Sequence, residues 1–262
     1  MGKVSTRHSR GLPRGRNARA GSPLAGAAEV TLAVFALAAL SVGLCFAIPG
    51  ASGLSEDIAV ELRYSALAEE TGKDAGATSH VLPDGAAAWL TVGGTSIDYP
   101  VAQASAEAPE FYLSHDLWGN DASAGCPYLD HRCDASATRA LVYAHRLGTT
   151  GKQFSPIAGT WRQVEFDKVG ALVWTTPDGT ESFRPLCALR VDKTYQPIQS
   201  FGEQSAEEFR SWLAGLLADS SAQTTDAAGL AARAKKEITL VTCSSEQSGQ
   251  RGRTLLVFVA TS

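Results

Sequence analysis

The stretch Lys-Glu-Ile-Thr-Leu-Val-Thr-Cys at residues 236–243 decides the fold, together with Arg-Thr-Leu-Leu-Val-Phe-Val-Ala at residues 253–260. Both runs are rich in β-branched and aliphatic residues, and the nine residues between them are polar and include two glycines. This pattern predicts two antiparallel strands joined by an open hairpin loop. Cys243 ends the first strand and Arg253 begins the second. Because neighbouring strands lie about 4.8 Å apart, we expect both side chains to reach one substrate at the mouth of the loop.

A third apolar run, Ala-Leu-Val-Tyr-Ala-His at residues 140–145, ends in a histidine just before a glycine-containing loop. A thiol beside a fixed cation ionises more easily, and the thiolate is the nucleophile. A cysteine nucleophile also needs a histidine that is close in space, although it can be distant in sequence. Cys243, His145 and Arg253 are therefore a candidate catalytic set. The alternative is a buried cysteine beside a surface arginine, with a structural histidine.

The run Thr-Leu-Val-Thr-Cys at residues 239–243, the arginine ten residues after its cysteine and the upstream Val-Tyr-Ala-His resemble the sortases, the cysteine transpeptidases of Gram-positive cell surfaces. The chain is similar to class B sortases in particular over three further stretches: residues 97–103 (IDYPVAQ), 111–116 (FYLSHD) and 124–130 (AGCPYLD). The resemblance extends from about residue 88 to the end of the chain.

By this resemblance Cys243 is the nucleophile, His145 is the general acid and base, and Arg253 holds the oxyanion or the substrate. The resemblance implies a two-step transpeptidation. The C-terminal sorting signal of a surface protein is cleaved through a thioacyl-enzyme, and an amine of a cell-wall peptidoglycan precursor or of a pilin then resolves it. It implies no metal and no cofactor. Two alternatives stay open: a membrane-anchored binding module without catalysis, and a cysteine peptidase that only hydrolyses.

The chain departs from the class B pattern after the cysteine, where Ser244 and Ser245 stand at positions at which class B enzymes often place an acid. Rival candidates for the other two roles are one arginine and two loop histidines: Arg251, His115 and His131. The ten-residue spacing from the cysteine favours Arg253 over its neighbour. The position at the end of an apolar strand favours His145 over the other two histidines.

Short runs with strand character recur along the C-terminal two thirds of the chain. There are eight: residues 89–92, 96–101, 126–129, 141–145, 171–176, 181–190, 236–243 and 253–260. The first two, the fifth and sixth, and the last two are predicted hairpins. Because closure removes exposed edges, this number of short strands predicts a mostly β fold with a closed barrel. Sortases are similar in having an eight-stranded barrel.

One helical pattern interrupts the strands. Ser205 and Glu208 form a capping box, and apolar residues then recur at helical spacing: Phe209, Trp212, Leu213, Leu216 and Leu217. We expect this helix to lie between the sixth and seventh strands, as it does in class B sortases, and its apolar stripe to pack on the core. By the same resemblance, the preceding loop, residues 195–201, is expected to wall the groove for the sorting signal.

The N-terminal part of the chain predicts an anchored protein. Residues 1–28 contain six Lys or Arg and no acid, which predicts a disordered basic tail in the cytoplasm. Residues 29–49 include nineteen consecutive uncharged residues, long enough as a helix to span a membrane. They predict an uncleaved single-pass anchor in the cell membrane with the catalytic domain outside the cell. A cleaved signal peptide and a lipoprotein signal at Cys45 are the alternatives.

Between the anchor and the barrel, residues 50–87 predict a linker and an N-terminal helix that Ser55 caps and that ends near Glu70. Residues 88–262 are the predicted sortase catalytic domain. From residue 29 onward the chain carries 17 basic and 27 acidic side chains, a formal charge of −10. This acidic body argues against a nucleic-acid partner.

Cys126 and Cys133 lie close together in the sequence with His131 between them. Two free thiols are the first interpretation of this pair. A disulfide is the second, because the domain is predicted to face an oxidising compartment. A metal site is the third, since a fourth ligand at suitable spacing is missing.

Overall fold

The structure, a computed structural model, describes residues 51–75, 80–148, 150–201, 205–245 and 250–261. The predicted basic tail (1–28) and the predicted membrane anchor (29–49) lie outside the described residues. Among the helices that are described, none has the length and apolar character needed to cross a membrane.

Eight strands form a closed barrel, which confirms the predicted fold. In chain order they are β1 (Ala88–Val92), β2 (Asp98–Gln103), β3 (Tyr128–Leu129), β4 (Arg139–Tyr143), β7 (Leu172–Thr176), β8 (Gly179–Asp192), β10 (Lys236–Cys243) and β11 (Gly252–Ala260). Their order around the barrel is β11-β10-β4-β3-β2-β1-β7-β8, and β8 pairs back onto β11 to close the ring. The short strand β9 (Ala222–Gln223) extends β8 outside the ring. A separate ribbon, β5 (Arg146–Leu147) with β6 (Lys152–Gln153), was not predicted.

The direction of the strands decides which residues meet at one edge of the barrel. Strand β10 runs antiparallel to β11 and parallel to β4, and β2 with β3 is the other parallel pair. Parallel neighbours end at the same edge. The carboxyl ends of β4 and β10 therefore lie beside the start of β11.

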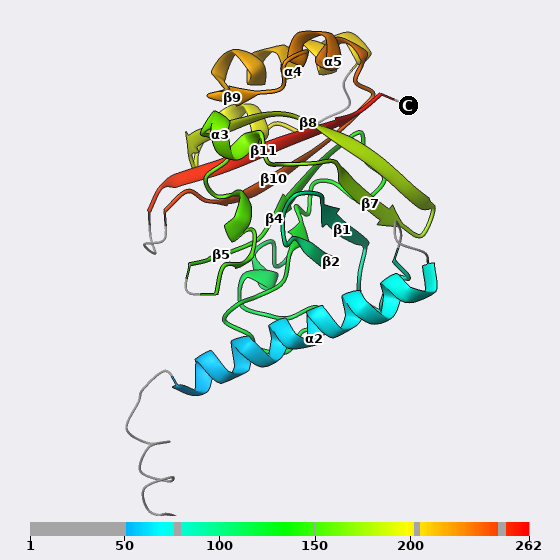
Figure 1. Ribbon diagram of the computed structural model, residues 1–262, viewed down its shortest axis with the longest axis vertical. Coiled ribbons are helices and arrows are strands. Elements are labelled where there is room, and N and C mark those ends of the chain that lie inside the picture. The colour runs from blue at the N-terminus through cyan, green and yellow to red at the C-terminus, as the bar shows by residue number, and fades with distance from the viewer. Residues whose placement is uncertain (1–50, 76–79, 149, 202–204, 246–249, 262) are drawn as a thin grey trace, which may run out of the picture. The chain divides into compact units, whose positions relative to one another are not determined.

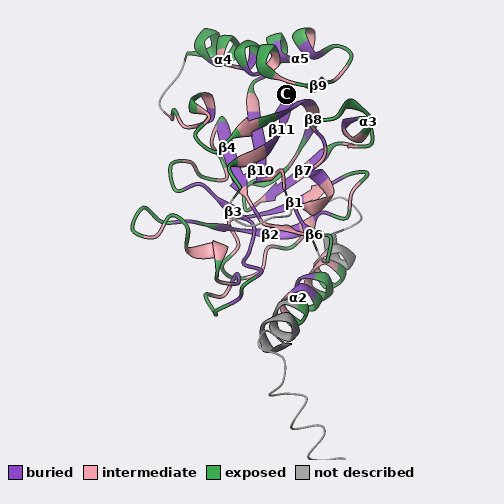
Figure 2. Cartoon of the chain, turned by 90° about the vertical axis from the view of Figure 1, so that its left-hand side faces the viewer, coloured by how far each residue is buried: buried purple, intermediate pink, exposed green. Residues whose placement is uncertain are grey.

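Strands β10 and β11 are buried on both faces, which explains their almost continuous apolar sequence. Along β11, alternate side chains enter two different cores. Leu256 and Phe258 point into the barrel, whereas Leu255 and Val257 pack against the helices outside it. These helices are α4 (Ala206–Asp219) and α5 (Ala227–Arg233), which lie together over this side of the barrel (Figure 1). Figure 2 shows the buried residues concentrated in the strands, with exposed residues on the outer faces of these helices.

Helix α4 confirms the predicted insertion between the sixth and seventh barrel strands. Its capping box is present, because Ser205 Oγ accepts from the backbone N–H of Glu208 and the Glu208 side chain accepts from the backbone N–H of Ser205. The predicted stripe packs on the core through its buried members, Phe209, Leu213 and Leu216. Helix α5, seven residues long and rich in alanine, was not predicted.

The N-terminal helix α2 (Ala51–Ala75) is longer than predicted. It begins before Ser55, so the prediction that this serine caps the helix is wrong: a cap stands outside the first turn, and Ser55 lies inside the helix. The helix packs on the barrel through Tyr64, which is fully buried and stacks on Trp118 with 5.9 Å between ring centroids. The remaining helical segments are η1 (Phe111–Leu113), η2 (Ser155–Ile157), α3 (Gln163–Phe166) and η3 (Gln196–Ile198).

Candidate active site

The ends of β10 and β4 and the start of β11 bring the three predicted site residues together. Cys243 is the last residue of β10, and it lies directly opposite Arg253 on β11. The parallel strand β4 ends at Tyr143, and the backbone continues beside β10 because Ala144 N–H donates to the Val241 carbonyl at 3.2 Å. His145 is the next residue, so it emerges at the edge where β10 reaches its cysteine.

The three residues line one pocket of about 430 Å³. Each of them is half-buried, so each side chain is accessible from this pocket. Other residues lining it come from the ends of η1 and β4 and from the segments after β3 and β8, among them Leu113, Tyr143, Asp130, Arg132, Lys193 and Gln199. The structure thus places the predicted cysteine, histidine and arginine on a common cavity rather than on separate surfaces.

His145 is held at two points. Its Nε2 lies 2.8 Å from the carbonyl oxygen of Leu113. Because a carbonyl oxygen can only accept, this contact requires the hydrogen to be on Nε2. The other ring nitrogen, Nδ1, is then the atom that can exchange a proton with a thiol or an amine. The backbone N–H of His145 donates to the side-chain oxygen of Gln153 at 3.2 Å.

Arg253 is oriented by its own loop. Its Nη1 donates to the carbonyl oxygens of Gln250 at 2.9 Å and Gly252 at 3.0 Å. Within the described part of the chain its guanidinium forms no ion pair. A guanidinium has five N–H donors, so donors remain for a substrate oxygen.

The rival arginine, Arg251, forms an ion pair outside the pocket. Arg251 binds both carboxylate oxygens of Asp192, with Nε and Nη2 each 2.7 Å from an oxygen. The pKa of Asp192 is lowered, mainly by these bonds and further by those from Thr194. Arg251 does not line the pocket that contains Cys243. The geometry therefore favours Arg253, as the spacing predicted.

Of the two rival histidines, only one lines the pocket. His115 stacks on Phe111 with 3.7 Å between ring centroids, and it does not line the pocket. His131 does line the pocket, with its Nδ1 3.6 Å from Asp130. Tyr143, at the end of β4, pairs with the first residue of β3, whereas His131 comes after the last residue of β3. His145 follows β4, which lies beside β10 and its cysteine.

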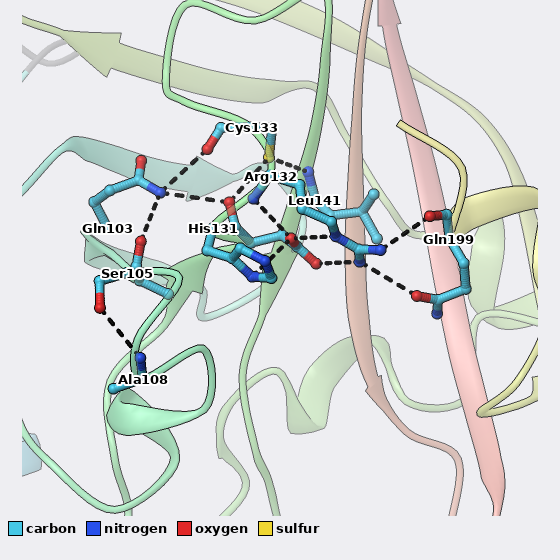
Figure 3. Close-up of polar contacts among 10 residues, drawn as sticks. Gln103, Ser105, Ala108, His131, Arg132, Cys133, Leu141 and Gln199 are labelled. Carbon is cyan, nitrogen blue, oxygen red and sulfur yellow. Dashed lines mark hydrogen bonds and ion pairs between the residues drawn. The ribbon is translucent and has the colours of Figure 1, made fainter. Parts of the chain in front are cut away.

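A polar cluster closes one wall of the pocket (Figure 3). Arg132 donates to both oxygens of Asp130, at 2.8 and 2.6 Å, and to the backbone and side-chain oxygens of Gln199, at 2.9 and 3.2 Å. Burial opposes ionisation of Asp130, but the hydrogen bonds from Arg132 outweigh it and lower the pKa of this carboxyl. Gln199 lies in the β8–α4 connection, the loop that was expected to wall a groove. Arg132 therefore ties this loop to the end of β3.

The other described cysteines do not line this pocket. Cys126, Cys133 and Cys187 are free thiols, which confirms the first interpretation of the Cys126 and Cys133 pair. Burial raises the pKa of Cys126 and of Cys133 to about 12. A thiol with so high a pKa is a poor nucleophile near neutral pH. Cys243 is the described cysteine that lines a large pocket.

Comparison with solved structures identifies the architecture. Staphylococcus aureus sortase B in complex with a substrate superposes with a TM-score of 0.63 at 17% identity, over 78% of this chain and 97% of that chain. Clostridium perfringens sortase B gives a TM-score of 0.58 at 19% identity, over 67% and 93% of the two chains. The chain has the class B sortase fold.

A third sortase, a Streptococcus pyogenes class B enzyme involved in pilus biogenesis, superposes with a TM-score of 0.54 at 21% identity, over 68% of this chain and 93% of that one. No family model matches the chain, and no curated protein matches it. The similarity to these sortases therefore lies in the fold rather than in the sequence.

Within this class B sortase fold, one residue that sequence reasoning missed connects the N-terminal helix to His145. Gln153 is almost fully buried and has a positive φ of 49°. Its backbone N–H donates to the Tyr99 hydroxyl at 3.1 Å, and this hydroxyl donates to Glu61 of α2 at 2.8 Å. A hydrogen-bonded chain therefore runs from Glu61 through Tyr99 and Gln153 to the backbone of His145. A single glutamine in a loop carries no periodic or spacing signal that could have predicted this role.

Proposed function

We propose that the protein is a sortase-type cysteine transpeptidase in which Cys243, His145 and Arg253 carry the chemistry. The observation that supports this most is the common pocket, onto which three residues at or just beyond strand ends, with complementary chemistry, open. The class B sortase fold supports it independently. An inert binding module would have no need to place a thiol, an imidazole and a guanidinium on one cavity.

In the first step, Cys243 transfers its thiol proton to Nδ1 of His145, the sulfur attacks the scissile carbonyl carbon of the bound peptide, and a C–S bond forms. The carbonyl electrons move to oxygen, and Arg253 stabilises the resulting oxyanion. The C–N bond then breaks as His145 donates its proton to the departing amine. The product is a thioacyl-enzyme and a released C-terminal fragment.

In the second step, the incoming amine attacks the thioester carbon, and His145 accepts the proton that the amine loses. The new C–N bond forms, the C–S bond breaks and Cys243 leaves as a thiolate. Water in place of the amine gives hydrolysis by the same route. The competition between water and the amine for the thioester therefore decides between cleavage and transfer.

The proposed donor is the C-terminal sorting signal of a surface protein, and the proposed acceptor is an amine of a peptidoglycan precursor or of a pilin. The structures of S. aureus sortase B with a substrate and of a sortase B with triglycine support a peptide donor and an amine acceptor. The pilus role of the S. pyogenes enzyme supports the pilin alternative. The proposed location is the cell membrane, through residues 29–49, with the catalytic domain outside.

The test is a product analysis with the full chain in detergent. A library of quenched fluorescent peptides is incubated with and without a peptide amine, and the products are identified by mass spectrometry. Transfer products that disappear in Cys243→Ala support the proposal. Hydrolysis products alone support the peptidase, and no cleavage of any library member supports the binding module. Arg210→Gln, a change at an exposed residue of α4 outside the pocket, serves as the control variant.

A further inference from the structure

A second pocket, of about 380 Å³, lies next to the proposed catalytic residues but shares no lining residue with the first. Two of its lining residues, Ser244 and Arg146, follow Cys243 and His145 directly in the chain. The bond from Arg146 Nη1 to the Ser244 carbonyl, at 2.6 Å, joins these two positions. The second pocket is therefore lined by the two residues that directly follow the proposed nucleophile and the proposed acid and base in the chain.

Three guanidinium groups border this second pocket, from Arg146, Arg162 and Arg190. Its carboxylate, Glu165, is 2.8 Å from the ammonium group of Lys168 and is thus already paired. The guanidinium carbons of Arg162 and Arg190 each lie 5.0 Å from the ring of Trp161, which holds both near the pocket. Neither forms an ion pair in the part of the chain that the structure describes.

Two serine residues that line the second pocket carry buried hydroxyl groups with unused hydrogen-bonding capacity. Ser155 Oγ and Ser244 Oγ are inaccessible to solvent and have no hydrogen-bond partner among the described residues. Buried polar groups are nearly always hydrogen-bonded in folded proteins. Hydroxyl donors together with planar guanidinium groups match the oxygen atoms of a carboxylate or a phosphate.

We propose that this second pocket binds the anionic group, a carboxylate or a phosphate, of the amine that resolves the thioacyl-enzyme. The inference rests on the proposed function, because that function requires two substrates to meet at one sulfur. The donor peptide occupies the pocket that contains Cys243, so the acceptor must approach along another surface. The second pocket borders Cys243 through Ser244, and an anion held there places an attached amine near the thioester.

Binding can be measured without catalysis. Tryptophan fluorescence of the full chain in detergent is titrated with inorganic pyrophosphate and, separately, with acetylglycine. We expect saturable quenching that Trp161→Phe removes and that the double variant R162Q/R190Q weakens at least tenfold. Arg184→Gln, which removes an exposed arginine from the same strand as Arg190 but outside both pockets, is the control and leaves the titration unchanged. Equal binding by the double variant, or no saturable binding of either anion, overturns the proposal.

The second measurement compares acceptors. The KM of diglycine, with its free carboxylate, is compared with the KM of diglycine amide in the transfer reaction. We expect the amide to have a KM at least tenfold higher in the native protein, and the ratio of the two KM values to approach one in R162Q/R190Q. If acetylglycine quenches the fluorescence, a ratio that the double variant does not change overturns the proposal. Quenching by pyrophosphate but not by acetylglycine assigns the pocket to phosphate-bearing acceptors, and the reverse assigns it to peptide carboxylates.

The two measurements also separate this inference from the proposed function. If the native protein forms no thioacyl-enzyme with any peptide, the proposed function fails, while the anion titration still decides whether the second pocket binds anions. If transfer occurs but neither anion binds, the proposed function stands and the acceptor subsite is wrong.

Discussion

The side-chain oxygen of Gln153 accepts a hydrogen bond from the backbone N–H of His145 at 3.2 Å. The amide nitrogen of the same side chain donates to the carbonyls of Ala124 at 2.6 Å and Gly125 at 3.2 Å. These three bonds tie the segment after β4 to the segment before β3. The position of the proposed acid and base therefore depends on a residue that itself performs no chemistry.

Replacing Gln153 with methionine keeps the length of the side chain but removes these bonds. Three backbone groups lose a partner, at a cost of about 1–3 kcal/mol for each one that stays buried. We expect peptide cleavage to fall by at least tenfold and the thermal midpoint to fall with it. Kinetics and thermal melting of Gln153→Met measure both effects. Unchanged kcat in a destabilised variant would show that Gln153 is structural and does not position His145.

The same chain of hydrogen bonds predicts a link to the N-terminal helix. Tyr99→Phe removes the hydroxyl that accepts from the buried N–H of Gln153 and donates to Glu61. We expect the free energy of unfolding to fall by about 1–3 kcal/mol. Urea denaturation provides the measurement. Tyr112→Phe is the matched control, because the Tyr112 hydroxyl has no hydrogen bond within the described residues, and it should cost less than half as much.

Glu237 predicts a dependence of stability on pH. This side chain is fully buried at the start of β10, and burial raises its pKa to about 8, although a hydrogen bond from Thr239 and the charge of Arg139 favour the ionised form. Because the pKa is higher in the folded than in the unfolded state, the stabilising contribution is complete below the ordinary glutamate pKa. It is lost progressively as the pH rises from there to about 8, and above that pH no further loss follows because the carboxyl is ionised in both states.

The neutral variant Glu237→Gln should lack this loss. We expect the native protein to become less stable by a few kcal/mol between pH 5 and pH 9, on the order expected for such a shift, and the variant to show a flatter profile. Chemical denaturation at several pH values tests this. A native profile that rises with pH over this range would mean that Glu237 is ionised when folded.

Arg253→Lys keeps the positive charge but loses the planar fork of donors. If Arg253 stabilises the oxyanion, this change should lower kcat by roughly 10²–10³-fold, or about 3–4 kcal/mol of transition-state stabilisation. Steady-state cleavage of the best library peptide gives the comparison. Arg251→Lys, at the arginine paired with Asp192, should retain most activity. Equal losses in the two variants would argue against a specific role for Arg253.

The barrel and the three proposed site residues could be predicted because their signals are local. Each strand has its own run of β-branched and aliphatic residues, and Cys243, His145 and Arg253 each stand at the end of such a run. The parallel pairing of β4 with β10, which brings His145 to the same edge as Cys243, was not predicted from the sequence.

The supporting contacts could not be predicted, since they join single polar residues that are far apart in the chain. Arg132 and Gln199 are separated by 67 positions, and Tyr99 and Gln153 by 54. Neither pair has a periodic pattern or a motif. The start of α2 was misplaced for a related reason: Ser55 followed by acids has the composition of a cap, but the helix continues through it to Ala51.

Direct detection of the thioacyl-enzyme tests the central claim. The full chain is mixed with the cleaved peptide, quenched in acid and digested, and the modified residue is located by mass spectrometry. The account predicts an adduct with the mass of the N-terminal peptide fragment on Cys243, which disappears when an amine is added and is absent from Cys243→Ala. An adduct on another residue, or full turnover by Cys243→Ala, would contradict it.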